Sequence, residues 1–179
     1  MKSTRGNIFT IITLIISYIK TEEIKEFIDA INTLREENGL NKLLEDDFLS
    51  SIADENIKKI ANTEVMPTDP EEQNRDVQEK LNKCGYGFVS ELNELELREE
   101  SPGYSAAFTD IKAIEEDKNP LFNPGYDRIG LGVASVEGKD RRYWALIFVN
   151  TSQDTDSSKE KDNENKTNSS EDKEDSDAN

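Results

Sequence analysis

The stretch RRYWALIFV, residues 141–149, constrains the fold more than any other part of the chain. From Tyr143 to Val149 every side chain is apolar or aromatic, which is typical of a central strand buried on both faces. The stretch RIGLGVASV precedes it and is joined to it by the short polar run EGKD, so the two predict a β-hairpin. A strand of this kind belongs in the middle of a layered domain.

Amphipathic helices are predicted ahead of this hairpin. Apolar residues recur at helical spacing in four segments, at about residues 22–38, 46–60, 70–84 and 101–117. Asp69 and Pro70 have the cap-then-proline pattern of a helix start, and so do Ser101 and Pro102. The apolar stripe of the second helix includes one polar residue, Asn56.

Between the third and fourth helices the period changes from helical to alternating. In YGFVSELNELEL, leucines alternate with Glu94 and Glu96, which predicts an extended segment, interpreted as a strand pair with a turn near Asn93. Because helices come first and paired strands last, the sequence predicts an α+β domain.

The two ends of the chain differ from this domain in composition. Residues 1–20 have Lys2 and Arg5 before an apolar run that is too short to span a bilayer, so we interpret them as a signal peptide, with an uncleaved anchor as the alternative. Residues 151–179 have ten acidic and four basic residues and almost no apolar side chain, which predicts a disordered acidic tail. The folded domain is therefore expected at residues 21–150, with no stable membrane span after signal cleavage.

Charge and composition exclude several classes of function. The chain of 179 residues has a net charge of −17, so a phosphate backbone would be repelled and nucleic acid is not expected as a partner. There is no histidine, and the single cysteine, Cys84, has no such base to make it a nucleophile. We expect Cys84 to be buried and inert.

Five short motifs occur in an order that resembles the CAP superfamily, also called SCP domains, which groups cysteine-rich secretory proteins, antigen 5 and pathogenesis-related proteins. These motifs are REENGLNKL, LNKCGYGFVSEL, SPGYSAAF, FNPGYDRIGLGVA and YWALIF, and they extend across nearly the whole predicted domain. The resemblance implies a three-layer α-β-α sandwich with a central antiparallel sheet. It also implies a cleft in which two histidines and acidic residues hold a divalent metal, usually zinc.

In this chain both histidine positions of the family are filled by other residues. The family motif SPGH aligns with SPGY, so Tyr104 takes the place of the second histidine, and the first falls near Pro67 in MPTDP. Glu91 takes the place of the family's acidic residue. One carboxylate and a neutral tyrosine make a poor zinc site, so we predict that the chain holds neither a metal nor another cofactor. If the three positions share a cleft, Pro67→His with Tyr104→His should restore zinc binding.

The resemblance therefore predicts a degenerate, secreted CAP domain. Our first interpretation is a non-catalytic extracellular binding module for a small apolar ligand, such as a lipid or sterol, or for a protein partner. The first alternative is a secreted hydrolase or protease, against which the absence of histidine and of any nucleophile–base motif argues. The second is a surface display or interaction protein with an acidic tail.

Overall fold

The computed structural model describes residues 5–86, 89–99, 103–136 and 138–151, with side chains from Lys20 onward. Within these ranges the chain forms, in order, α1 (Arg5–Glu37), β1 (Leu44–Glu45), α2 (Asp47–Thr63), α3 (Pro70–Lys83), β2 (Glu91–Glu99), α4 (Tyr104–Lys112), the 3-10 turn η1 (Pro120–Phe122), β3 (Arg128–Ser135) and β4 (Arg142–Asn150). The predicted signal peptide and the tail beyond Thr151 lie largely outside the part described in full, and both stay predictions.

The four strands form one sheet in the order β1-β3-β4-β2. β4 pairs with β3 on one side and with β2 on the other, both antiparallel, whereas the short β1 adds to β3 in parallel. Every residue of β4 from Tyr143 to Val149 is buried. The prediction of a central strand buried on both faces is therefore confirmed.

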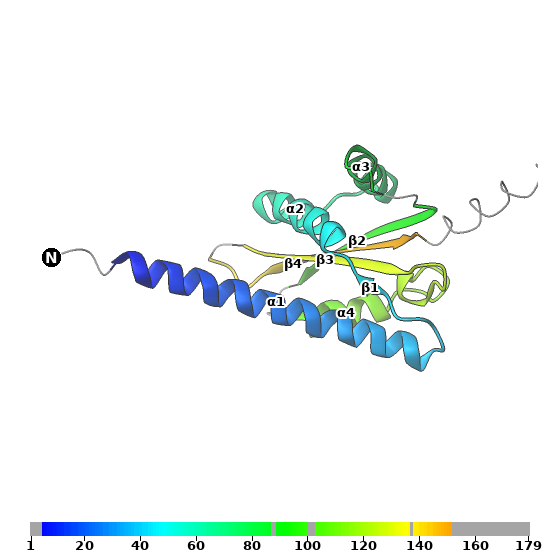
Figure 1. The fold of residues 1–179 in the computed structure, drawn as a ribbon, viewed down its shortest axis with the longest axis horizontal. Coiled ribbons are helices and arrows are strands. Elements are labelled where there is room, and N and C mark those ends of the chain that lie inside the picture. Colours follow the sequence, from blue (N-terminus) through cyan, green and yellow to red (C-terminus); the bar gives the residue numbers. More distant parts are fainter. Residues whose placement is uncertain (1–4, 87–88, 100–102, 137, 152–179) are drawn as a thin grey trace, which may run out of the picture.

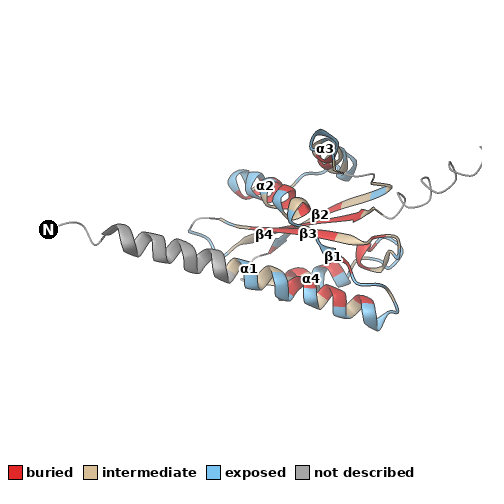
Figure 2. Ribbon diagram, viewed as in Figure 1, coloured by how far each residue is buried: buried red, intermediate tan, exposed pale blue. Residues whose placement is uncertain are grey.

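Helices cover both faces of the sheet (Figure 1). α1 and α4 pack on the face that presents Trp144, Leu146 and Phe148, and α2 and α3 pack on the face that presents Tyr143, Ala145 and Ile147. Buried residues lie along the sheet and the inner sides of these helices (Figure 2). The α-β-α sandwich implied by the family resemblance is confirmed.

Two glycines of β3 let α2 approach the sheet closely. A Cβ atom on Gly130 would lie 2.3 Å from the backbone carbon of Leu49, and one on Gly132 would lie 2.4 Å from the backbone nitrogen of Asp54. Neither contact is sterically allowed, because the clashing atoms belong to helix backbone. The IGLG pattern in the sequence is thus a packing feature of the β3–α2 interface.

Arg35, in the last turn of α1, is a buried cation that holds a loop. Its side chain is 0% exposed and donates hydrogen bonds to the backbone oxygens of Asn41 (2.8 Å), Leu121 (2.8 Å) and Asn123 (3.0 Å). Burial lowers the pKa of this guanidinium. The arginine of REENGLNKL therefore fixes the segment that leads into β3.

Some boundaries differ from the sequence prediction. α1 begins at Arg5 rather than near Glu22, because no proline or turn signal interrupts the helical segment. β2 is one continuous strand without a turn at Asn93, and α4 ends at Lys112 rather than near Asp117. Cys84 is exposed at the end of α3, so the expectation of a buried thiol is wrong.

In the described part of the chain, no helix has both the length and the apolar character needed to cross a membrane.

Thr151 belongs to the domain rather than to the tail. Its backbone N–H donates to Asp127 Oδ1 at 2.9 Å, and its hydroxyl donates to Asp127 Oδ2 at 2.5 Å. The sequence placed the boundary one residue earlier, because Thr151 is polar and its partner lies 24 residues away.

We expect a chain that ends at Thr151 to melt within about one degree of the full chain, since residues 152–179 have almost no apolar side chain to dock. A chain that ends at Asn150 should lose about 1–2 kcal/mol, because it lacks both hydrogen bonds to the Asp127 carboxylate. Differential scanning calorimetry of the three lengths checks both expectations. A drop of several degrees on removing residues 152–179 alone would contradict the first.

Candidate functional site

The structure separates the three positions that the family resemblance assigned to one cleft. Glu91 begins β2 and is exposed, and its Oε2 accepts a hydrogen bond from Asn123 Nδ2 at 3.2 Å. Tyr104 begins α4, and its ring stacks on Phe27 of α1 at 5.4 Å between centroids. Pro67 is exposed in the connection between α2 and α3.

The strand register shows how far apart these positions are. Glu91 pairs with Asn150 at one end of β4, whereas Glu99 pairs with Arg142 at the other end. At about 3.3 Å per residue, the eight steps between Glu91 and Glu99 span roughly 26 Å. Tyr104 follows shortly after Glu99, so it lies at the opposite end of β2 from Glu91.

The sheet separates the third position as well. Pro67 follows Met66, which packs with the α2/α3 core, whereas Tyr104 packs with the α1/α4 core on the other face. The three positions are therefore not brought together. Among the described residues, no group of three His, Cys, Asp or Glu side chains is arranged to hold a metal ion.

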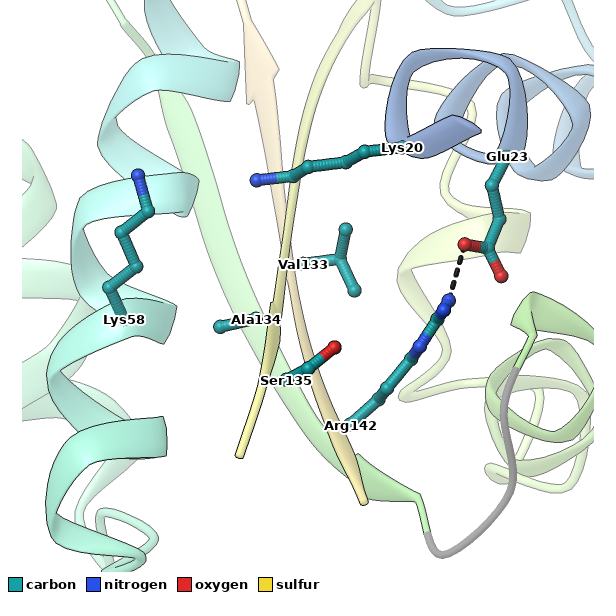
Figure 3. Close-up of a pocket in the computed structure, with 7 residues that line it drawn as sticks. All are labelled: Lys20, Glu23, Lys58, Val133, Ala134, Ser135 and Arg142. Atoms are coloured by element: carbon teal, nitrogen blue, oxygen red, sulfur yellow. Dashed lines mark hydrogen bonds and ion pairs between the residues drawn. The ribbon is translucent and has the colours of Figure 1, made fainter. Parts of the chain in front are cut away.

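A pocket of about 480 Å³ lies at the end of the domain where α1 joins it (Figure 3). It is lined by Lys20 and Glu23 of α1, Lys58 of α2, Val133, Ala134 and Ser135 of β3, and Arg142 of β4. Its volume falls within the range of about 300–1,000 Å³ that is usual for ligand pockets. Sequence reasoning missed it, because its walls come from four elements that are distant in the chain.

Two glutamates with raised pKa values lie on the face of β2 that α2 and α3 cover. Glu94 is 5% exposed, and its Oε1 accepts a hydrogen bond from Asn56 Nδ2 at 2.8 Å. Lys80 donates to the oxygen of the same Asn56 amide. Burial raises the pKa of Glu94, while the Asn56 hydrogen bond and the nearby Lys80 lower it by less.

Glu96 lies two residues along the same face of β2. Its Oε2 accepts a hydrogen bond from Gln73 Nε2 of α3 at 2.5 Å. Burial, with a smaller contribution from the charge of Glu94, raises the pKa of Glu96 to about 8. Glu96 is therefore largely protonated at neutral pH.

We call Asn56, Gln73, Lys80, Glu94 and Glu96 the β2 acid cluster. The hydrogen bonds described for its two carboxyl groups come from amide nitrogens, and none comes from a hydroxyl or thiol group among the described residues. The cluster ties β2 to α2 and α3 with polar contacts. Asn56, a polar residue in an apolar helical stripe, was the sequence signal that could have located it.

The cluster predicts an unusual pH dependence of stability. Because the folded-state pKa of Glu96 is raised from its ordinary 4.5 to about 8, folding favours the protonated form. This contribution to stability is complete below about pH 4.5 and is lost as the pH rises toward 8. Glu96→Gln mimics the protonated acid and does not titrate. From pH 5 to pH 8 its free energy of unfolding should therefore fall by about 1–2 kcal/mol less than that of the parent, a figure reduced to allow for the screening of Glu96 by solvent.

Urea unfolding at pH 5 and pH 8 measures the difference. Glu71→Gln is the matched control, because it removes one negative charge from an exposed position at the start of α3. If parent and Glu96→Gln lose equal stability over this range, Glu96 does not have the raised pKa in the folded state.

A third acid with a raised pKa lies at the end of β2. Glu99 is buried, and burial together with the neighbouring carboxyl of Asp110 raises its pKa to about 6. Among the described residues, its Oε1 has no hydrogen-bond partner. Glu99 faces α4 rather than α3, so it is separate from the β2 acid cluster.

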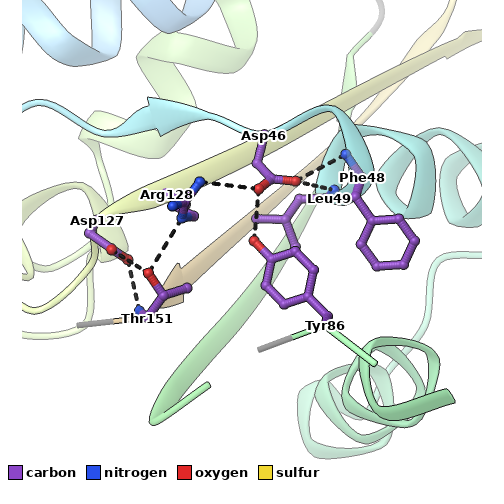
Figure 4. Close-up of polar contacts among 7 residues, drawn as sticks. All are labelled: Asp46, Phe48, Leu49, Tyr86, Asp127, Arg128 and Thr151. Atoms are coloured by element: carbon purple, nitrogen blue, oxygen red, sulfur yellow. Dashed lines mark hydrogen bonds and ion pairs between the residues drawn. The ribbon is translucent and has the colours of Figure 1, made fainter. Parts of the chain in front are cut away.

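Asp46 contacts three segments of the domain, which are the start of α2, the segment after α3 and β3 (Figure 4). Its Oδ1 caps α2 by accepting from the N–H groups of Phe48 and Leu49, both at 3.0 Å. Its Oδ2 accepts from the Tyr86 hydroxyl at 2.8 Å and lies 3.5 Å from Arg128 Nη1. Burial and this hydrogen bond raise the pKa of Tyr86. Both carboxylate oxygens are thus engaged in structural contacts.

Comparison with solved structures shows the same architecture in bacterial proteins. An outer surface protein from Borrelia burgdorferi superimposes with a TM-score of 0.59 at 18% identity, covering 73% of this chain and 93% of that chain. A cysteine-rich secretory protein from Staphylococcus aureus gives 0.56 at 18% identity, covering 73% and 38%. An extracellular protein with an SCP domain from Bacillus anthracis gives 0.59 at 17% identity, covering 74% and 41%. This chain thus spans about two-fifths of the last two proteins, and at these identities the likeness shows the fold.

The sequence itself was also compared with curated proteins and with family models. No curated protein matches it significantly. The model of the cysteine-rich secretory protein family, CAP, matches residues 28–149, which is more than half of the chain. The matched segment runs from the last third of α1 to the penultimate residue of β4 and so includes α2, α3, α4 and nearly the whole sheet. The chain therefore belongs to the CAP family.

Proposed function

We propose that this protein is a secreted, non-catalytic CAP domain that binds a ligand and has lost the family metal site. One observation carries the proposal: Tyr104, at the second histidine position of the family, stacks on Phe27 in the α1/α4 core. A side chain used for packing at that place leaves no imidazole for a metal and no base for a nucleophile.

The remaining features support the same role. Glu91, the retained acid, is exposed and hydrogen-bonded to Asn123 at the far end of β2 from Tyr104. The acids with raised pKa serve as internal contacts between layers, and no hydroxyl or thiol donates to the described carboxyls of Glu94 and Glu96. An extracellular place is supported by the apolar N-terminal run and by the names of two similar proteins, one an outer surface protein and one extracellular.

Calorimetric titration with zinc tests the loss of the metal site. We expect the parent to bind no stoichiometric zinc. The variant Pro67→His with Tyr104→His should not bind it either, because the two positions lie on opposite faces of the sheet. This differs from the expectation drawn from sequence, which placed both positions in one cleft.

The outcomes are distinct. Tight, stoichiometric zinc binding by the parent would overturn the proposal. Zinc binding by the double variant alone would show that the two positions meet in solution. It would contradict their placement on opposite faces of the sheet, but it would leave the loss of the metal site in the parent standing. Mass spectrometry of a solvent extract of the purified protein tests for a bound lipid or sterol.

A further inference from the structure

The outer edge of β3 is only partly covered. β1 pairs with Arg128 and Ile129 and extends no further. Beyond it, Leu131 donates its N–H outward to Ser50 Oγ at 3.2 Å, whereas Val136 donates inward to Arg141 of the hairpin at 3.2 Å. Because backbone groups alternate along a strand, Val133 and Ser135 direct their N–H and C=O groups outward.

These outward backbone groups border the 480 Å³ pocket that is lined by Lys20 and Glu23 of α1. Among the described residues, no hydrogen bond reaches the outward backbone groups of Val133 or Ser135. The pocket is lined by three consecutive residues, Val133 to Ser135, although their side chains point alternately to the two faces of the sheet (Figure 3). The strand edge itself is therefore the floor of the pocket, with α1 on one side and α2 on the other. We call this space the β3 slot.

The charges around the β3 slot favour an acidic occupant. Lys20 and Lys58 share a single carboxylate, that of Asp54, and Arg142 pairs with Glu23. Three cations thus share two carboxylates, in a chain whose net charge is −17. The chain as a whole repels anions, but around the β3 slot these three cations outnumber the two carboxylates that pair with them.

We propose that the β3 slot binds an extended, acidic peptide segment of a partner protein by strand addition. The strand edge at Val133 and Ser135 offers backbone donors and acceptors without described partners, and an added backbone in extended form can match them. β1 already uses the same edge in this way at Arg128 and Ile129. Acidic side chains of the added strand would reach Lys20, Lys58 and Arg142. The inference rests on the proposed binding role. It adds the class of partner, an acidic peptide, and the surface that binds it, the β3 slot.

The test uses the full chain and a fluorescein-labelled hexapeptide of alternating glutamate and valine. Fluorescence anisotropy should show binding at least about tenfold tighter than for the same peptide with lysine in place of glutamate. Amide hydrogen exchange followed by NMR should show new protection at Val133 and Ser135 on adding the peptide. The inward N–H of Ala134 is the internal control, because it should change little.

Two matched variants test the charge contribution. Lys58→Gln should weaken binding about two- to fivefold, as expected for one partly exposed charge pair. Lys59→Gln should leave binding unchanged, because Lys59 lies next to Lys58 on α2, is equally exposed at 62% against 61%, and does not line the pocket. Both side chains are on the surface, so neither change threatens folding.

Three results would overturn the proposal. The first is equal binding, or no binding, of the acidic and basic peptides. The second is binding without new protection at Val133 and Ser135. The third is protection of both amides before any peptide is added, which would mean that a segment of this chain, such as its acidic tail, occupies the slot. None of these results affects the zinc titration. A failure of peptide binding can therefore be distinguished from a failure of the proposal that the family metal site is lost.

Discussion

Trp144→Ala should lower the free energy of unfolding by about 3–5 kcal/mol, which is the usual cost of truncating a buried aromatic side chain. Trp144 is 0% exposed at the centre of β4, and its ring meets Phe27 of α1 edge to face at 5.4 Å. Phe27 also contacts Tyr104 and Phe108 of α4. Removing the indole would thus leave a cavity between the sheet, α1 and α4 that these rigid rings cannot fill.

A second substitution at the same position separates packing from hydrogen bonding. Among the described residues, Trp144 Nε1 has no hydrogen-bond partner, so Trp144→Phe should lose much less stability than Trp144→Ala. Leu44→Ala is the surface control, because Leu44 is 60% exposed. Urea unfolding measures all three variants. If Trp144→Ala unfolds like the parent, the α1/α4 layer does not pack on this strand as described.

The parts of the fold that sequence predicted well are those that depend on local chemistry. Asp46 and Asp69 cap α2 and α3 through their own side chains, and each cap is visible as an acidic residue directly before a helical pattern. The all-apolar stretch in β4 could only be a strand covered on both faces.

The parts that sequence did not predict depend on contacts between distant residues. Glu94 and Glu96 alternate with leucines, a pattern typical of a strand with one solvated face, but that face is covered, so that Glu94 is buried and Glu96 is half-buried against Gln73 of α3. The turn expected near Asn93 is absent because Asn93 pairs with Phe148 inside the continuous β2–β4 ladder. No local feature of the segment specifies either contact.

The family motifs illustrate the same difference. Of SPGY, Ser101 and Pro102, the predicted helix start, lie outside the described residues. Tyr104 begins α4, and Gly103 precedes it with a φ of 100°, which glycine adopts most easily, and without a side-chain cap. The motif therefore predicted the helix correctly, although the described helix begins at Tyr104. It could not show that Tyr104 would turn into the core against Phe27 while Glu91 lay at the other end of β2.

Arg35→Met should cost about as much as the tryptophan substitution, about 3–5 kcal/mol, although it keeps most of the side-chain volume. The guanidinium donates to the carbonyls of Asn41, Leu121 and Asn123 at 2.8–3.0 Å, and the residue is fully buried. Hydrogen bonds from a charged donor contribute about 1.5–3 kcal/mol each, and carbonyls left without a donor inside the domain lose their solvation as well.

Arg35→Lys separates the effect of the several N–H donors of the guanidinium from the effect of its positive charge. In Arg35 the Nε donates to the Asn41 carbonyl, while Nη1 donates to those of Leu121 and Asn123. Lysine keeps the positive charge but has one compact ammonium group, which cannot replace two separate donor nitrogens at once. We therefore expect Arg35→Lys to lose most of the stability that Arg35→Met loses, while Arg75→Met, at an exposed position on α3, should change little. Urea unfolding compares the three. Parent-like stability of Arg35→Lys would show that a buried charge near these carbonyls is sufficient, and that the planar geometry of arginine is not what holds the segment before β3 in place.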